Sequence, residues 1–480
     1  MVDVRLSTFR FIISLILIFG VHVIDDGHIR SAEASETTPI FYVDARGKTG
    51  NEIGVELGNS IKAQFPDIEL KLDGYLAYFF GLIASDTGIP AQTLFDSFAV
   101  PRINAIKPNI DKRYRDEVNA LASGLALSNS DSIGDGHLSS NEIWALELVA
   151  DIARETNCSG FGVFGNYAST DSPVVGRNLD WHTNEGMRSL QAITVYHYDD
   201  RTFVNIGFAG FAGVLTGFNS DGLFAGILDS PMDDDYPHPP SGKRSYVFDL
   251  RNALESYTTI SGAANALYSK PYAFSHNILF ADTTDVQVLE HPQGAYGQLR
   301  TAQSQLNNDI SWGKSNQIAV VNFFVLEGYS NQRYPFNTIR WNRLRELATF
   351  NTSQKAAAND IKSIMLDTTS YPYSIFSAST VQSMVFVPVE RKLFLYRVPA
   401  SGIHHPTPTM NEVSILLTVI GDINSDREVD LRDAILALQV MAGINTSIEI
   451  YKETDVNGDE RIGLEEAVYV LQVISGLRVQ

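Results

Sequence analysis

The stretch RETNCSGFGVFG, Arg154 to Gly165, contains Cys158, the single cysteine of this 480-residue chain. After it, two apolar runs, SGFGVFGNY and PVVGRNLDW, flank the polar turn ASTDS, a pattern typical of a β-hairpin. A pairing centred near Ser169 places Cys158 opposite Asp180, with Arg177 a few residues away. We therefore expect a thiol, a guanidinium and a carboxylate to meet at one end of this hairpin.

The chemistry of such a thiol depends on its neighbours. A nearby cation favours the thiolate and lowers the pKa of a cysteine, whereas a cysteine in apolar surroundings is an inert core residue. A nucleophile also needs a base. His182, His276 and His291 are candidates, although the residues around Cys158 do not match a papain-like peptidase. The other candidate is the α-amino group of Cys158, which becomes available only if the Asn157–Cys158 bond is cut.

The start of the chain predicts export. Arg5 and Arg10 precede the apolar run Phe11–Ile24, and Ala32-Glu33-Ala34 follows as a cleavage site, so we expect a signal peptide over residues 1–34. An uncleaved anchor is less favoured, because the run is shorter than the roughly 20 residues of a spanning helix. The expected mature protein is secreted, cell-surface or periplasmic, with no integral membrane span after signal removal.

The composition is that of a globular protein, with 44% hydrophobic and 19% charged residues. The formal net charge of −20 arises from 56 acidic and 36 basic residues. This balance argues against nucleic-acid binding, which needs basic patches, and is compatible with cation sites.

The texture of the sequence changes along the chain. Residues 35–157 have helical patterns, and residues 158–400 consist mainly of short strands with Gly, Asn and Asp between them. Many strands with segregated helices predict an α+β layered domain. Residues 401–414 are interpreted as a linker, because Pro and Gly interrupt regular structure there. Residues 415–480 hold a duplication at a spacing of 33 residues, which predicts two copies of one small unit.

Each copy, DINSDREVDLRD and DVNGDERIGLEE, spaces its oxygen-bearing residues as a calcium loop followed by a helix does. The expected ligands are Asp422, Asn424, Asp426, Glu428, Asp430 and Asp433 in the first loop, and Asp455, Asn457, Asp459, Arg461 and Glu466 in the second. Glu428 and Arg461 would contribute backbone carbonyls. We therefore expect structural calcium in this part of the chain.

The tail resembles a dockerin module, in which two calcium loop-helix units bind a cohesin partner. The resemblance implies a small all-α domain and a cohesin-like protein partner. The loops depart from the pattern at position 6, where Arg427 and Glu460 stand in place of the preferred Gly.

A third candidate loop, DSIGDGHLSSNE, lies in the helical segment. It offers Asp131, Asp135, Ser139 and Glu142 as calcium ligands. The alternative is a turn that caps the helix after it.

The hairpin itself, NCSGFGVFG…VVGRNLDW, resembles the start of the mature catalytic chain in the cysteine N-terminal-nucleophile (Ntn) hydrolases. The relevant group is that of choloylglycine hydrolase, acid ceramidase and isopenicillin-N acyltransferase (peptidase C45-like). The resemblance continues through GFNSDGLFAGI, HNILFADTTDVQVLEH, VVNFF and NTIRWNRLREL. It implies a four-layer αββα sandwich, a helical pro-segment that is kept as a small subunit, a self-catalysed cut before Cys158 and no cofactor for catalysis.

The resemblance also implies roles for five residues. Cys158 would be the nucleophile through its sulfur and the base through its new amine. Asp180 would orient that amine, and Arg177 would lie beside the thiolate or the substrate carbonyl. Asn322 would donate to the oxyanion, and Arg340 matches the late arginine of the site.

Three positions depart from the family pattern. Val321 replaces a Thr, Phe323 replaces a His of the acyltransferase branch, and the segment from Ile227 to Asp229 lacks an Asn of the bile-salt hydrolases.

The sequence thus predicts a secreted, self-processing hydrolase that cleaves a small N-acyl amide through an acyl-thioester on Cys158 and docks to a partner through its tail. An acyltransferase with the same intermediate is the alternative. A calcium-dependent interaction protein with an inert Ntn-like domain is the alternative of another class. Four aromatic residues suggest an apolar pocket for a fatty or aryl acyl group, namely Phe208, Phe211, Phe218 and Phe224.

Overall fold

The structure is a computed structural model that describes residues 37–125, 128, 130–152, 157–170, 172–230, 239–329, 334–417, 420–426, 428–457, 459 and 461–477. The predicted signal peptide, Arg427 and Glu460 lie outside these residues. Among the described helices, none is both long enough and apolar enough to cross a membrane.

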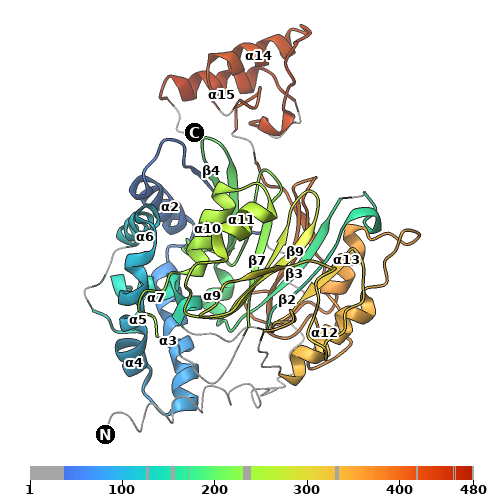
Figure 1. Cartoon of the computed structure of the whole chain (residues 1–480). Helices are drawn as coiled ribbons and strands as arrows, with labels where there is room; N and C mark the ends of the chain where they lie inside the picture. The colour runs from blue at the N-terminus through green and yellow to red at the C-terminus, as the bar shows by residue number, and fades with distance from the viewer. Residues whose placement is uncertain are drawn as a thin grey trace.

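Two β-sheets lie at the centre of the molecule (Figure 1). Within the described residues, the larger has eight strands in the order β1 (Ile40–Asp44), β4 (Gln191–His197), β5 (Thr202–Phe208), β6 (Thr216–Asn219), β7 (Phe224–Asp229), β8 (His276–Ala281), β9 (Val286–His291) and β10 (Gln298–Arg300). The smaller has six, in the order β11 (Gln317–Val320), β2 (Ser159–Val163), β3 (Val174–Asp180), β12 (Thr380–Val387), β13 (Lys392–Arg397) and β14 (Asn411–Val413).

The two sheets face each other, and the glycines of β2 allow them to approach closely. A Cβ on Gly160 would lie 2.5 Å from Leu279 Cδ2, and one on Gly162 would lie 2.7 Å from Val286 Cγ1. Because successive side chains of a strand alternate between its faces, Phe161 points away from the larger sheet, into the apolar cluster on the outer face.

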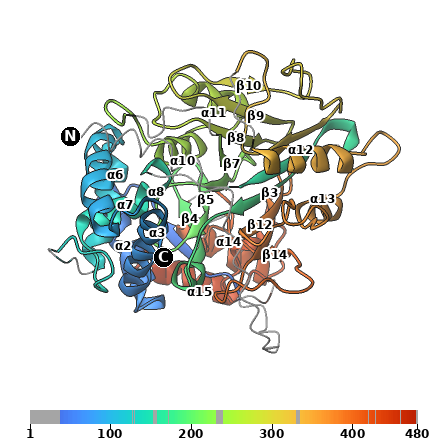
Figure 2. The ribbon, with the colours of Figure 1, turned by 90° about the horizontal axis from the view of Figure 1, so that it is seen from below.

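Helices cover the outer faces of both sheets (Figure 2). The larger sheet is covered by α10 (Tyr246–Ser256) and α11 (Ile260–Leu267), and the smaller by α12 (Pro335–Leu347) and α13 (Ala358–Met365). The short helix α9 (Glu185–Ser189) connects β3 to β4. The predicted α+β class is confirmed, with the order helix, sheet, sheet, helix.

The segment before Cys158 differs from the helical segment that the sequence predicts, because it begins with a strand. Phe41 and Val43 of β1 turn inward, and β1 pairs in parallel with β4 at the edge of the larger sheet. The helices that follow are α2 (Gly50–Gln64), α3 (Ile68–Thr87), α4 (Ala91–Leu94), α5 (Val100–Ile106), α6 (Lys112–Gly124), α7 (Ser140–Glu147) and α8 (Val149–Ile152). The N-terminal segment is therefore part of the layered structure.

The predicted linker over residues 401–414 is corrected at its end. Asn411 to Val413 form β14, which pairs with Leu393 to Leu395 of β13. No proline follows Pro408 in this segment, so residues 411–413 all have backbone N–H donors. These donors can pair with the backbone carbonyl oxygens at the edge of β13.

The duplicated tail forms two equivalent helices, α14 (Leu431–Met441) and α15 (Leu464–Ile474), which pack on each other. Their small core contains Ile423, Leu436, Ala437, Ile462 and Ala467. Figure 1 shows this pair at one end of the molecule, outside the two sheets.

Candidate active site

Cys158 directly precedes β2 and is buried. Its Sγ lies 3.9 Å from Arg177 Nη2 and 3.8 Å from the backbone oxygen of Asp180. The expected pairing of Cys158 opposite Asp180 is wrong by one residue, because Ser159 pairs with Asn178. The hairpin nevertheless brings the three groups together.

Arg177 crosses the space between the sheets. From β3 its guanidinium donates to the hydroxyl of Thr216 on β6 and to the backbone oxygen of Ile227 on β7. Gly226 leaves room for the side chain, since a Cβ there would lie 2.3 Å from Arg177 Cδ. These contacts hold a buried cation beside the thiol.

Asp180 is positioned by the neighbouring strand. The hydroxyl of Thr380 on β12 donates to its Oδ1 at 2.7 Å. The register of β12 against β3 shifts between Thr380 and Gln382, so one extra residue, Val381, stands in β12 at this point. Such a bulge reorients the side chains beside it, and here it lies next to the carboxylate.

Asn322 and Arg340 complete the site from the other side. Arg340 donates to the backbone oxygen of Cys158 at 3.1 Å and to Asn322 Oδ1 at 3.0 Å, and its Nη1 lies 3.6 Å from Asp180 Oδ2. Asn322 Nδ2 donates to the backbone oxygen of Asp229 at 3.0 Å. The structure therefore brings all five predicted residues into one connected cluster.

Burial dominates the electrostatics of this cluster. It raises the pKa of the Cys158 thiol, although the charge of Arg177 acts in the opposite direction. In the uncut chain, the loss of hydration therefore outweighs the effect of the nearby cation on this pKa. Burial also raises the pKa of Asp180 to about 6, while Arg340 opposes the shift.

Two of the three histidines expected as alternative bases, His276 and His291, pack in an aromatic cluster, and burial lowers the pKa of the third, His182. His276 and His291 stack on each other with ring centroids 5.1 Å apart, and His276 also stacks on Tyr246 at 4.7 Å. The hydrogen bonds of the Cys158 sulfur within the described residues go to Arg177 and Asp180, not to a histidine. This arrangement does not support a papain-like dyad.

Sequence reasoning missed several residues that support the cluster. Thr216, Thr380 and Asn337 are buried and hydrogen-bonded to Arg177, Asp180 and Arg340 respectively. Asn337 precedes Arg340 by three residues and therefore lies on the same face of the helix. This spacing can be seen in the sequence. Thr216 and Thr380 come from distant strands and leave no local signal.

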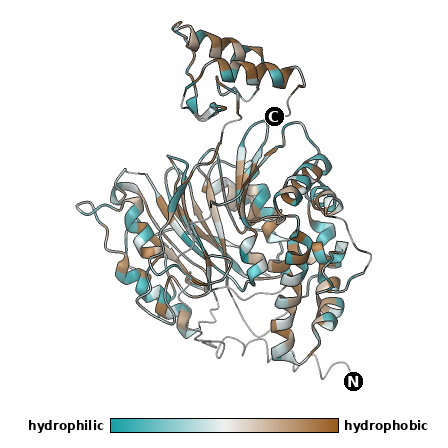
Figure 3. Cartoon of the chain, turned by 180° about the vertical axis from the view of Figure 1, so that it is seen from behind, coloured by the Kyte–Doolittle hydropathy of each residue, from teal (hydrophilic) through white to brown (hydrophobic). Residues whose placement is uncertain are grey.

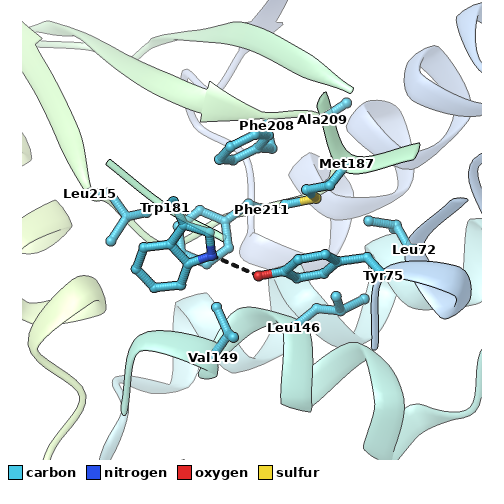
Figure 4. A pocket seen from close by; sticks show the side chains of 11 residues that line it. Leu72, Tyr75, Leu146, Val149, Trp181, Met187, Phe208, Ala209, Phe211 and Leu215 are labelled. Carbon is cyan, nitrogen blue, oxygen red and sulfur yellow. Dashed lines mark hydrogen bonds between the residues drawn. The ribbon is translucent and has the colours of Figure 1, made fainter. Parts of the chain in front are cut away.

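Figure 4 shows an apolar pocket whose lining includes sequence neighbours of the cluster but none of its five residues. Trp181, next to Asp180, and Leu215, next to Thr216, form part of its wall, and Trp181 donates to the Tyr75 hydroxyl at 2.7 Å. Phe208 and Phe211 line it as expected. Its free space is about 20 Å³, little more than one water molecule needs.

The other two aromatic residues expected in the pocket belong to the core. The ring of Phe386 lies 4.4 Å from that of Phe218 and 5.6 Å from that of Phe224. They pack the two sheets together.

The predicted calcium ligands of the tail act as hydrogen-bond acceptors within their own loops. Asp433 accepts from the backbone of Ile423 at 2.7 Å, and Glu466 from that of Gly463 at 2.6 Å. Arg432 pairs with Asp426, Glu428 and Asp430. In the described part of the chain, no three His, Cys, Asp or Glu side chains are grouped so as to hold a metal ion.

The third loop shows the alternative arrangement, a helix cap. Ser139 Oγ accepts from the backbone of Glu142 at 3.1 Å, and the Glu142 carboxylate accepts from the backbone of Ser139 at 2.6 Å. Asp131 accepts from Asn141, and Asp135 from the backbone of His137. The Ser139–Glu142 pair caps the N-terminus of α7.

Residues 168–396, just under half of the chain, match the family model described as acyl-coenzyme A:6-aminopenicillanic acid acyl-transferase. The match includes Arg177, Asp180, Asn322 and Arg340 and begins after Cys158. No curated protein sequence matches the chain.

Several solved structures are similar at low identity. A Caenorhabditis elegans ortholog of N-acylethanolamine-hydrolyzing acid amidase has 17% identity, with 48% of this chain and 93% of that chain covered and a TM-score of 0.36. Penicillin V acylase from Agrobacterium tumefaciens has 14% identity, with 54% and 87% covered and a TM-score of 0.31. A conjugated bile acid hydrolase variant from Clostridium perfringens has 12% identity, with 54% and 92% covered and a TM-score of 0.31.

Proposed function

We propose that this chain, which carries the domain of an Ntn amidohydrolase or acyltransferase, is a secreted, self-processing enzyme that cleaves the amide bond of an N-acyl substrate. The proposed reaction is hydrolysis of the carbon–nitrogen bond of an amide other than a peptide, whereas the family model matched by residues 168–396 is described as an acyl-transferase. The observation that carries the proposal is the buried thiol of Cys158, which lies between Arg177 and the Asp180–Arg340 pair.

The first reaction would be the cut before Cys158. The sulfur attacks the carbonyl carbon of Asn157, the carbon–nitrogen bond breaks, and the nitrogen of Cys158 takes up the thiol proton. Water then hydrolyses the thioester, which releases the carboxylate of Asn157 and restores the thiol. This reaction supplies the amine that the site lacks in the uncut chain.

The mature site would use the same chemistry on its substrate. The new amine takes the thiol proton, and the thiolate attacks the amide carbonyl. Asn322 supports the negative oxygen that forms, which is usually a large contribution in acyl transfer. The leaving amine takes the proton, and water releases the acid. Because the pKa of Asp180 is about 6, this carboxylate is ionised at neutral pH and stabilises the ammonium.

The pocket of Figure 4 supports an apolar acyl group as the substrate moiety. Its wall combines residues of the N-terminal segment, such as Leu72 and Val149, with Met187 and Phe208 of the catalytic part. Since its free space is small, an acyl chain requires these side chains to move apart. An acyltransferase would differ only in the acceptor, with an amine in place of water.

The tail is proposed to dock the enzyme to a protein partner, with calcium as a structural ion. Both helices expose apolar side chains at equivalent positions 33 residues apart, and Figure 3 shows hydrophobic residues along both helices. They are Leu431, Ile435, Leu438 and Met441 on α14, and Leu464, Val468, Leu471 and Ile474 on α15. Deletion of residues 415–480 should preserve turnover and abolish docking. A full-length chain that docks but turns over no N-acyl amide would favour the interaction protein with an inert domain instead.

Intact mass and N-terminal sequencing test the proposal directly. Purified protein should yield a fragment ending at Asn157 and one starting at Cys158, and Cys158→Ala should remain uncut and inactive. Ser159→Ala, which removes the neighbouring hydroxyl, is the matched control and should still be cut. An uncut wild-type chain whose activity survives Cys158→Ala would refute the proposal.

A further inference from the structure

The turn that carries Asn322 is held by the opposite sheet. It follows β11 of the smaller sheet, and the backbone N–H of Phe323 donates to the oxygen of Val321 at 2.8 Å, so Asn322 lies at the apex of a three-residue turn. Asn277, on β8 of the larger sheet, donates its side-chain amide to the oxygens of Val321 at 3.0 Å and Phe323 at 3.1 Å. One amide thus fixes the carbonyls on both sides of Asn322.

This arrangement fixes the orientation of the Asn277 amide and lowers stability. If the amide were turned over, its oxygen would face two carbonyl oxygens. In the orientation observed, Oδ1 is buried and has no hydrogen-bond partner within the described residues. An unsatisfied buried acceptor lowers stability, because the oxygen loses its hydration and gains no hydrogen bond in return.

Glu290 holds the segment that directly follows this turn. It lies directly opposite Asn277 in the β8–β9 register. Its Oε2 accepts from the backbone of Val325 and Leu326, both at 3.0 Å, and Arg300 donates to its Oε1 at 2.7 Å. The carboxylate and the guanidinium are both buried. The segment around Asn322 is therefore fixed on both sides by one cross-strand pair.

We propose that Asn277, supported by Glu290 and Arg300, is a positioning residue that aims the Asn322 amide at the oxygen of the scissile carbonyl. The inference rests on the proposed function. Asn322 contacts Arg340 and the Asp229 backbone through its own side chain, so a displaced turn moves the donor. A hydrogen-bond donor stabilises an oxyanion only when it is held in place before the charge forms.

A double-mutant cycle tests this role. Asn277→Ala should lower kcat about 10- to 100-fold with little change in KM, since a small misplacement of a reacting group has effects of this size. In an Asn322→Ala background, the same substitution should change kcat by less than about twofold, because the residues act as one unit. Asn277→Ser and Glu290→Gln provide milder variants if Asn277→Ala does not fold.

Asn219 offers a matched control. It is also buried, and its amide donates to two backbone oxygens, those of Leu254 and Tyr257, both at 2.8 Å. Asn219→Ala should lower thermal stability and leave kcat unchanged. If the double variant lowers kcat by the product of the two single effects, Asn277 and Asn322 act independently. That result would overturn this inference but not the proposed function. A wild-type chain that turns over no N-acyl amide would overturn the proposed function and the inference with it.

Discussion

At Cys158, burial and charge act in opposite directions on one thiol. Burial raises its pKa, and Arg177 offsets only part of that effect. In the uncut chain the thiol is therefore mostly protonated at neutral pH, and its nitrogen is an amide, which takes up a proton only as its bond to the Asn157 carbonyl breaks. Cutting the Asn157–Cys158 bond would convert this amide nitrogen into an amine, which can accept a proton, without moving the sulfur.

Gly226 provides a test of the Arg177 position. A methyl group on Gly226 would lie 2.3 Å from Arg177 Cδ and 2.7 Å from Nε, and the buried guanidinium is already bound to Thr216 and Ile227. Gly226→Ala should therefore slow self-cleavage at least tenfold and destabilise the protein by about 1–3 kcal/mol through overpacking. The rate is measured by mass spectrometry of the fragments.

Gly81→Ala is the control, because a Cβ at that position of α3 meets no atom within 4 Å. It should leave cleavage unchanged and add about 0.5–1 kcal/mol of stability, the usual gain from Ala over Gly in a helix. If Gly226→Ala cleaves itself at the wild-type rate, self-cleavage does not require the observed position of Arg177.

At the scale of elements, strands β8 and β9 carry a buried histidine pair. Burial lowers the pKa of His291 to about 4, compared with about 6.5 in an unfolded chain. Between these values, the unfolded chain binds a proton that the folded one does not. Stability should therefore fall as pH falls from 6.5 to 4, by about 3 kcal/mol at most.

His291→Phe should reduce this pH dependence, while His197, whose pKa burial also lowers to about 4, should retain a share of it. The measurement is the free energy of unfolding in urea at pH 7.5 and pH 5, for the variant and the wild type. His137→Gln, at an exposed position, should leave the difference between the two pH values as it is in the wild type. An unchanged difference in His291→Phe would assign the acid sensitivity to other groups.

At the scale of the whole molecule, buried ion pairs join the segment before Cys158 to the catalytic part. Arg251 of α10 contacts Glu117 of α6 through two bonds of 2.9 Å and Glu255 through one of 2.7 Å, and all three side chains are buried. The guanidinium also lies over the ring of Tyr196, 4.3 Å from its centroid. These contacts do not depend on the Asn157–Cys158 bond.

We therefore expect the two fragments to remain associated after cleavage and to elute together in size-exclusion chromatography. Glu117→Gln should release the N-terminal fragment at lower urea, since loss of one partner of a buried pair costs about 3–5 kcal/mol. Lys112→Gln on the same helix is the control. Its pair with Asp116 is exposed and such pairs contribute about 0–1 kcal/mol. If both variants release the N-terminal fragment at the same urea concentration, the ion pair of Arg251 with Glu117 does not hold the fragments together.

Much of this molecule could be predicted from local pattern. Alternating apolar residues predict the strands, and a spacing of 33 residues predicts the two equivalent tail helices. The hairpin after Cys158 predicts the meeting of Cys158, Arg177 and Asp180, because close sequence neighbours across a short turn must pair. The one-residue error in its register shows the limit of this reasoning, since turn geometry decides register.

Features that depend on contacts between distant segments were decided only by the tertiary structure. The sequence alone determined the α+β class, because periodicity is a local property, and the choice of candidate site residues followed from a resemblance of motifs to a known family. Only the folded chain revealed that burial raises the pKa of Cys158, that β1 and β14 extend the sheets, and that Asn277 of one sheet holds Asn322 of the other. Desolvation and cross-sheet hydrogen bonds arise from packing, and packing has no period in the sequence.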